Sequence, residues 1–218
     1  MAFFKIILFL AAFVSFRGTA LLGQDSKLLY TASDQILKLK SGFLVVMLPY
    51  NIPLRNNVAK YNQIDSTSKS AIRYRKDLLK LEKVNQSWIE AMKENYSFSP
   101  YFIMYDTAFL HFKKSPSTKY FVGGSAPLDS ITDWNSANYL IMRKGSTPEQ
   151  KLDAVVINDQ NFSQIPPPFP SFERTTKSAG FFLLLLNQPL EKSYSKIIQS
   201  FDKRLNKWYL RVSNTSSK

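Results

Sequence analysis

Carboxylates beside predicted loops are the side chains of this sequence best suited to catalysis, because two carboxylates can hydrolyse a glycosidic bond without histidine. Asp129 and Asp133 lie in the polar segment "LDSITDWNS", where Trp134 can stack on a sugar, and Asp153 and Asp159 lie in or beside further loops. Anchoring of the loop on the core is the simpler interpretation of Trp134. Polar loops between strands often carry function, so Asp129, Asp133 and Trp134 are the candidate ligand-binding residues.

Other catalytic and metal-binding patterns are missing from the sequence. His111 is the one histidine and there is no cysteine, which excludes disulfides, thiol nucleophiles and His-rich or thiolate metal sites. A Ser-His-Asp triad needs His111 to meet a carboxylate, but in a regular strand Asp106, five residues away, faces the opposite side. The sequence also lacks G-x-S-x-G, a phosphate-binding glycine loop and H-E-x-x-H. We therefore predict no catalytic residue, no cofactor and no metal.

The N-terminus has the pattern of a secretory signal peptide. Lys5 precedes a run from Ile6 to Phe16 that is apolar except for Ser15, and a small residue follows at each possible cleavage position. We predict a signal peptide over residues 1–23, cut after Gly23, with Ala20 as the alternative. The apolar run is too short to cross a bilayer, which takes about 20 residues. The sequence thus predicts an exported protein, periplasmic or extracellular, with no transmembrane segment after cleavage.

The charge of the chain is strongly basic. The formal net charge is +13, and it falls to +11 when Lys5 and Arg17 leave with the signal peptide. Such a chain is attracted to polyanions, which outside the cell are lipid head groups, anionic polysaccharides and DNA. The alternative is that the lysines only keep an exported protein soluble. The remaining length suits one domain, predicted over residues 24–212, with a disordered tail over 213–218.

Apolar, β-branched runs predict several strands. "FLVVMLP", from Phe43 to Pro49, predicts a central strand that a proline ends. The later runs are closely spaced and separated by short turns, which indicates antiparallel neighbours. These later predicted strands are Tyr101–Phe112, Lys119–Gly124, Asn138–Gly145 and Asp153–Asp159.

A long polar stretch from Asn56 to Tyr96 contains neither glycine nor proline and predicts helix. Asp65 to Ser68 are good capping residues, which divides the stretch into a short helix and a longer one. Apolar residues spaced three and four apart form one stripe from Ala71 to Met92, with Asn85 within it. We expect this stripe to pack on the chain's own sheet. A homodimer seam through the Ala71–Met92 helix is the alternative, because buried asparagines set register in coiled coils.

The C-terminal part predicts an amphipathic helix beginning at Leu190. One side is apolar and the other is rich in lysine, and we expect the apolar side to cover the sheet. An interfacial membrane helix is the alternative. The apolar residues are Leu190, Tyr194, Ile197, Phe201, Leu205, Trp208 and Val212.

Together these elements predict an α/β (α+β) fold: a single domain with a mixed or antiparallel sheet, a long polar helix after the first strand and an amphipathic C-terminal helix. The order loosely resembles thioredoxin-like topology. The redox activity of that fold does not carry over to a chain without cysteine, and a fold resemblance alone does not establish function.

The segment "QIPPPFPSFERT", residues 164–175, directly follows a predicted strand. Its prolines favour an extended conformation and cannot donate hydrogen bonds within a sheet. The segment can serve as a recognition ligand, as the lip of a binding site or as a stiff connector. Aromatic-lined grooves that bind proline-rich ligands belong largely to intracellular signalling domains. We therefore predict a connector, with Phe162, Phe169 and Phe172 packed back onto the core.

Three segments also resemble a known group of proteins. "DAVVINDQNFSQIPPPFPSFER", "SGFLVVMLP" and "FSPYFIMYD" are similar to segments of small exported proteins of Bacteroidota that have no assigned activity. The resemblance spans most of the chain after the signal peptide and rests on hydrophobic runs and one modest motif. It implies export and a single α/β domain, and it transfers no catalytic residues.

The leading functional hypothesis is a non-enzymatic binding or interaction protein of the cell envelope. It rests on the predicted export, the missing catalytic patterns and the basic charge. The expected partner is an anionic envelope polymer or a lipid surface. The alternatives are a carboxylate-dependent hydrolase of envelope polysaccharide and a peripheral protein that binds membranes through its C-terminal helix.

Overall fold

The central strand β1 (Phe43–Leu48) pairs in parallel with β2 (Tyr101–Tyr105) on one side and with β4 (Tyr139–Ser146) on the other. All of its side chains are buried. A parallel strand covered on both faces needs an apolar residue at every position, which explains the run "FLVVML" and confirms the predicted central strand. The computed structural model describes residues 31–126, 138–176 and 192–216.

The sheet has six strands in the order β3-β2-β1-β4-β5-β6. β2, β1 and β4 run parallel, and β3, β5 and β6 each run antiparallel to the neighbour on their inner side. This mixed sheet and its helices form one domain, so the predicted fold class is confirmed. A helix of residues 31–41 precedes β1. The further elements are α2 (Ile52–Ile64), α3 (Lys69–Asn95), η1 (Asp106–Ala108), α4 (Phe109–Lys114), η2 (Thr118–Tyr120), β3 (Phe121–Gly124), β5 (Asp153–Asn158), β6 (Phe172–Arg174) and α6 (Tyr194–Ser216).

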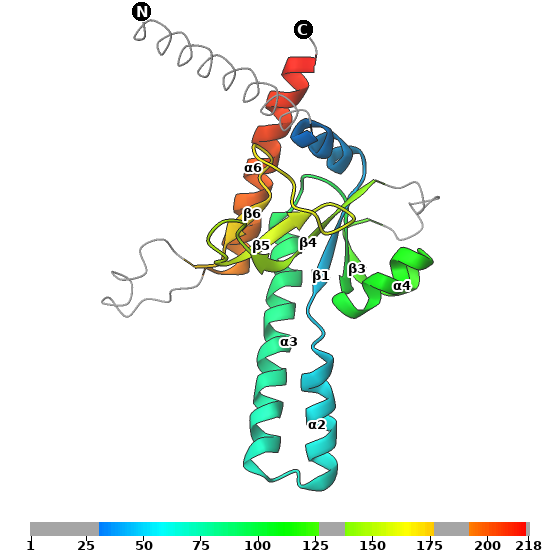
Figure 1. Ribbon diagram of the computed structural model, residues 1–218, viewed down its shortest axis with the longest axis vertical. Coiled ribbons are helices and arrows are strands. Elements are labelled where there is room, and N and C mark those ends of the chain that lie inside the picture. The colour runs from blue at the N-terminus through cyan, green and yellow to red at the C-terminus, as the bar shows by residue number, and fades with distance from the viewer. Residues whose placement is uncertain (1–30, 127–137, 177–191, 217–218) are drawn as a thin grey trace, which may run out of the picture.

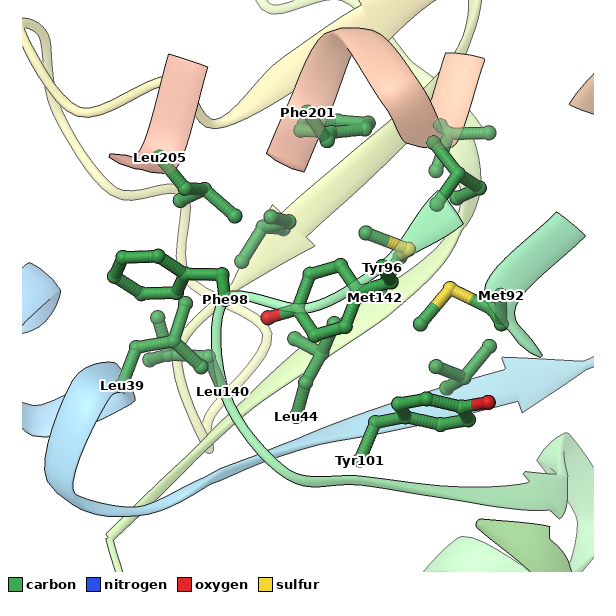
Figure 2. Packing of buried hydrophobic residues seen from close by; sticks show 14 of the residues in the cluster. Leu39, Leu44, Met92, Tyr96, Phe98, Tyr101, Leu140, Met142, Phe201 and Leu205 are labelled. Atoms are coloured by element: carbon green, nitrogen blue, oxygen red, sulfur yellow. The ribbon is translucent and has the colours of Figure 1, made fainter. Parts of the chain in front are cut away.

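Three helices cover one face of the sheet and enclose the larger core. They are the helix of residues 31–41, α3 and α6 (Figure 1). Figure 2 shows Leu39, Met92 and Phe201 from these helices gathered over Leu44 and Leu140 from the strands. Burial of large apolar side chains is the main favourable term in folding, so this cluster holds the layers together.

An aromatic cluster covers the opposite face. Phe112 of α4 packs edge-on against Phe121, with 5.2 Å between ring centroids, and Phe43 packs edge-on against Phe102 at 5.3 Å. Edge-to-face aromatic pairs add to the stability that area burial provides. The short helix α4 and this cluster thus close the side of the sheet that the three long helices leave open.

The predicted strand over residues 101–112 is wrong in its second half. β2 ends at Tyr105 and the chain turns into η1 and α4. Phe109 and Phe112 are buried, while Leu110 is 68% exposed and His111 is also exposed. Burial of residues three apart is the pattern of a helix. This pattern was not recognised in the sequence because the segment directly follows the apolar residues of β2 and was taken as part of the same strand. His111 therefore lies on a helix, where it stacks on Tyr120.

The helix α2 and the first part of α3, residues 52–83, form an arm that extends away from the sheet (Figure 1). No residue of α2 is buried. The two helices are joined by the rings of Tyr61 and Tyr74, whose centroids lie 5.3 Å apart. Ser68 caps α3 by accepting a hydrogen bond from the Ala71 backbone N–H, so the predicted division at Asp65–Ser68 is confirmed.

The predicted apolar stripe of α3 is covered by the chain itself. Ala71, Trp88 and Met92 are fully buried. Asn85 is 5% exposed, and its Nδ2 donates to the Pro49 carbonyl oxygen at 3.0 Å. Asn85 therefore fixes α3 to the end of β1. Only the inner part of the stripe, with Trp88 and Met92, packs over the sheet as we expected, whereas the outer part lies on the arm and packs against α2.

The apolar side of α6 is buried against the sheet, as we expected. Ile197, Phe201 and Leu205 belong to the larger core, so they face protein rather than a membrane. Leu190, where we predicted the helix to begin, lies outside the described residues. The exposed lysines on the opposite side are Lys196, Lys203 and Lys207.

The end of α6 differs from the prediction of a disordered tail over residues 213–218, because the helix continues through Ser216. Two hydroxyl groups bond to carbonyl groups of the preceding turn: Ser213 Oγ donates to the Leu210 oxygen at 3.2 Å, and Thr215 Oγ1 donates to the Arg211 oxygen at 2.8 Å. Serine and threonine within helices commonly bond to carbonyl groups three or four residues earlier in this way.

We expect the stability of the fold to fall at alkaline pH because of Tyr96. Burial raises the pKa of the Tyr96 hydroxyl far above its usual range; the hydroxyl pairs with Ser99 Oγ at 2.9 Å, and the charge of Asp202 raises the pKa further. A folded-state pKa above the unfolded value of about 10 contributes stability that is complete below about pH 10 and is lost as pH rises through the folded value. The free energy of unfolding, measured with urea, is expected to decrease above pH 10.

The variant Tyr96→Phe separates this effect from general alkaline denaturation. It lacks the ionisable group but keeps the ring, and we expect it to lose less stability between pH 9 and 11 than the wild type. Equal losses in the two proteins contradict the assignment to Tyr96.

Candidate functional site

The three candidate residues from the sequence, Asp129, Asp133 and Trp134, lie outside the described residues, as does the predicted signal peptide. Of the other carboxylates considered, Asp159 holds a tight turn: its Oδ1 accepts hydrogen bonds from the backbone N–H groups of Asn161 and Ser163 at 2.9 and 2.7 Å. The role of Asp159 is therefore to shape the loop that follows β5.

The proline segment lines a cavity of about 600 Å³ between the β4–β5 turn, β6 and α6. Its volume lies within the range of small-ligand sites, which is about 300–1,000 Å³. We call it the proline cavity. The segment connects β5 to β6, as predicted for a connector, and it also forms the lip of this cavity. The lining residues are Thr147, Pro148, Glu149, Gln150, Gln164, Pro166, Pro167, Pro168, Phe169, Ser171, Phe172, Arg174 and Arg204.

Two kinds of contact fix the proline segment against the core. Ile165 and Phe169 are buried, at 2% and 4% exposed. The Ile157 backbone N–H donates to the Ser171 carbonyl oxygen at 2.7 Å, which returns the chain to the sheet. The predicted packing of Phe169 onto the core is confirmed. Phe162 remains 37% exposed, although its ring packs edge-on against buried Phe109 with 4.9 Å between centroids.

Two arginines give the proline cavity a positive wall. Arg174 on β6 donates from Nη2 to Gln150 Oε1 at 2.6 Å. Arg204 on α6 donates from Nη1 to the Phe172 carbonyl oxygen and to Glu173 Oε2, both at 2.9 Å. These bonds orient both guanidinium groups. A guanidinium group offers five N–H donors in a planar fork, so donors remain for a bound anion.

Glu173 holds Arg204 in position. Its carboxylate is 15% exposed and also pairs with Lys192 Nζ at 2.7 Å and with Ser200 Oγ at 3.1 Å. Glu173 therefore ties β6 to α6 and keeps one cation at the cavity wall. The cavity depends on this contact, because its two arginines come from these two elements.

The lining of the proline cavity contains few carboxylates. Among its described lining residues Glu149 is the one carboxylate, so a pair of carboxylates for glycoside hydrolysis is not assembled there. The described residues also contain no group of three His, Cys, Asp or Glu side chains that can hold a metal ion. Arginine, amide and apolar side chains instead suit recognition of an anionic ligand with an apolar face.

A second, smaller cavity of about 330 Å³ lies at the ends of the parallel strands. We call it the strand-end cavity. Three elements surround it: the end of β1, strand β4 and Asp106, which directly follows β2. The loop after β5 closes one side. Its lining residues are Met47, Pro49, Asp106, Arg143, Lys144 and Phe162.

Sequence reasoning missed both cavities because the residues that line each one come from elements far apart in the chain. Gln150, Arg174 and Arg204 come from three separate elements, and no spacing along the chain brings them together. The available signal was the proline segment itself, which was considered as the lip of a site but not placed opposite the arginines.

Within the part of the chain that the structure describes, no helix is both long enough and apolar enough to span a membrane. Comparison with known proteins gives no relative: no family model, no curated protein and no solved structure matches the chain.

Proposed function

We propose that this chain is an exported, non-enzymatic binding protein of the cell envelope that holds an anionic ligand in the proline cavity. The observation that carries the proposal is the pairing of two oriented arginines, Arg174 and Arg204, with a proline-lined wall. The net charge of +13 attracts polyanions at long range. The arginines supply the local recognition.

The ligand that fits this wall best is an acidic saccharide unit of an envelope polymer. Guanidinium groups bind carboxylates through two parallel hydrogen bonds. The amides of Gln150 and Gln164 can bond to hydroxyl groups, and Phe172 with the prolines offers an apolar surface to the C–H face of a sugar ring. The cavity therefore offers partners both for the carboxylate of an acidic sugar and for its hydroxyl and C–H groups.

The proline wall adds affinity by being rigid before the ligand binds. Proline fixes its backbone φ, and buried Ile165 and Phe169 anchor the segment at both ends. A site that is ordered in advance loses less conformational entropy on binding. Replacement of the prolines is thus expected to weaken binding even where no direct contact is lost.

Isothermal titration calorimetry with a galacturonate hexamer and a neutral galactose hexamer tests the proposal. We expect the acidic oligomer to bind and the neutral one to bind at least tenfold more weakly. Arg174→Gln removes a charged hydrogen bond worth about 1.5–3 kcal/mol and is expected to reduce affinity for the acidic oligomer about tenfold or more. Arg174→Lys keeps the charge but lacks the planar fork of donors, and its affinity is expected to lie between those of the wild type and Arg174→Gln.

The matched control is Arg211→Gln, which removes the same charge from an exposed position on α6 outside the cavity. If Arg211→Gln weakens binding as much as Arg174→Gln, net charge explains the interaction and the cavity does not. Retention of binding at 0.5 M salt is expected for the cavity, whereas diffuse attraction between exposed charges is screened there.

A further inference from the structure

The strand-end cavity lies where α/β sheets bind ligands. The chain leaves β1 toward β2 on one side, while β4 lies on the other side of β1, and all three strands are parallel. In open α/β sheets, ligands bind outside the carboxyl ends of the strands at such a point. Met47 near the end of β1, Asp106 directly after β2 and Arg143 on β4 line the cavity from these three strands.

Opposite charges stand on its two sides. Asp106 lies beyond one neighbour of β1, and Arg143 and Lys144 lie on the other neighbour. Within the described ranges, none of these three side chains forms an ion pair. Charges that share a cavity without pairing to each other are available to a ligand that carries both signs.

Hydrogen bonds hold both charges in place. Asp106 Oδ1 accepts from the Tyr50 backbone N–H at 3.1 Å. Arg143 Nε donates to Oδ1 of Asn158 at 3.2 Å, and Asn158, which is 5% exposed, donates from Nδ2 to the Phe162 carbonyl oxygen at 3.2 Å. A buried amide therefore orients the guanidinium group and also fixes the loop that closes the cavity.

Phe162 provides an apolar wall in an unusual backbone conformation. Its φ is 62°, a region that residues other than glycine seldom adopt. Its ring lies over Arg143, with the guanidinium carbon 5.3 Å from the ring centroid. Residues in such sparsely populated conformations cluster at ligand sites. Phe162 and Met47 give the cavity an apolar side between the charges.

We infer that the strand-end cavity binds a free amino acid with an apolar side chain. The ammonium group faces Asp106, the carboxylate faces Arg143, and the side chain lies against Met47 and Phe162. The volume of about 330 Å³ is at the small end of the range for ligand sites, which suits a single amino acid. The site is separate from the proline cavity and does not depend on the function proposed for it.

Calorimetry on the whole chain with leucine, N-acetyl-leucine and leucinamide tests the inference. N-acetyl-leucine lacks the ammonium group and leucinamide lacks the carboxylate. We expect leucine to bind at least tenfold more tightly than either analogue, because each analogue leaves one protein charge without its partner. Methionine and phenylalanine are measured beside leucine. Absence of saturable binding by all three amino acids overturns the inference, as does equal binding of leucine and both analogues.

Two variants assign the charges to the two ends of the ligand. Asp106→Asn keeps an oxygen for the Tyr50 N–H and is expected to lose the preference for leucine over N-acetyl-leucine while keeping the preference over leucinamide. Arg143→Gln is expected to show the reverse pattern. A loss of both preferences together in each variant, with circular dichroism unchanged, contradicts the two-ended arrangement.

Lys114→Gln is the matched control, since Lys114 is an exposed cation at the end of α4 outside the cavity. It is expected to bind leucine and both analogues as the wild type does. If it weakens leucine binding as much as Arg143→Gln does, the cavity cations have no specific role and the inference fails.

Discussion

Replacing Gly42 with alanine is expected to prevent stable folding. Gly42 joins the helix of residues 31–41 to β1, and its N–H donates to the Lys38 carbonyl oxygen at 2.9 Å. A Cβ at this position would overlap the carbonyl oxygen of Asn138 and lie 2.8 Å from that of Lys38. Both obstacles are backbone atoms, so relief requires the helix or β4 to move.

The expected loss exceeds about 4 kcal/mol of the free energy of unfolding, a size reserved for severe core or backbone conflicts. Movement of β4 breaks its pairing with the central strand, since the Phe43 N–H donates to the Asn138 oxygen at 3.1 Å. Urea denaturation followed by circular dichroism measures the effect. The result expected for Gly42→Ala is a chain without a cooperative transition.

Gly123→Ala is the matched control. A Cβ at Gly123 meets nothing within 4 Å, and its φ is not positive. The change is expected to stay within about 0.5 kcal/mol of the wild type. A Gly42→Ala protein with an unchanged urea midpoint means that the junction between the first helix, β1 and β4 is not packed as described.

The second large effect is expected for Trp88→Ala. Trp88 of α3 is fully buried, and its ring stacks on Tyr194 of α6 with 5.1 Å between centroids. The change leaves a cavity at the contact between the two longest helices, and truncation of a buried tryptophan costs about 3–5 kcal/mol. Urea denaturation is expected to show this loss as a lower midpoint.

Leu79→Ala on the same helix is the comparison, because Leu79 is 59% exposed. Alanine is the better helix former, so this variant is expected to lie within about 0.5 kcal/mol of the wild type. A loss at Leu79 equal to that at Trp88 indicates that the exposed side of the arm is covered by something in solution, and that α3 is not held mainly by its contact with α6.

The fold follows from the sequence wherever one local pattern dominates. The run Phe43–Leu48 is apolar at every position, and only a central parallel strand buries all of these residues. Asp65–Ser68 interrupts a polar helical stretch with capping residues, and the helix break is found there. Such signals act within a few residues and need no knowledge of the rest of the chain.

Other features depend on contacts that sequence spacing does not reveal. The apolar run through Phe112 suits a strand or a helix equally, and packing of Phe109 and Phe112 onto the aromatic face decides for the helix. The proline cavity joins residues 147–150 to Arg204, which lies on the last helix. Local propensity cannot predict a contact between segments so far apart. The rigidity of the proline segment, by contrast, could be predicted from its sequence.

The arm has a mechanical consequence because α3 is one continuous helix from the tip into the core. At 1.5 Å per residue, Lys69 at the tip lies about 28 Å along the axis from Trp88. Trp88 and the bond from Asn85 to Pro49 hold the inner part of the helix, so they act as a fulcrum. At that length, a rotation of one degree there displaces the tip by about 0.5 Å. The arm is thus a lever: a rotation of only a few degrees at its base displaces the tip by more than about 1 Å.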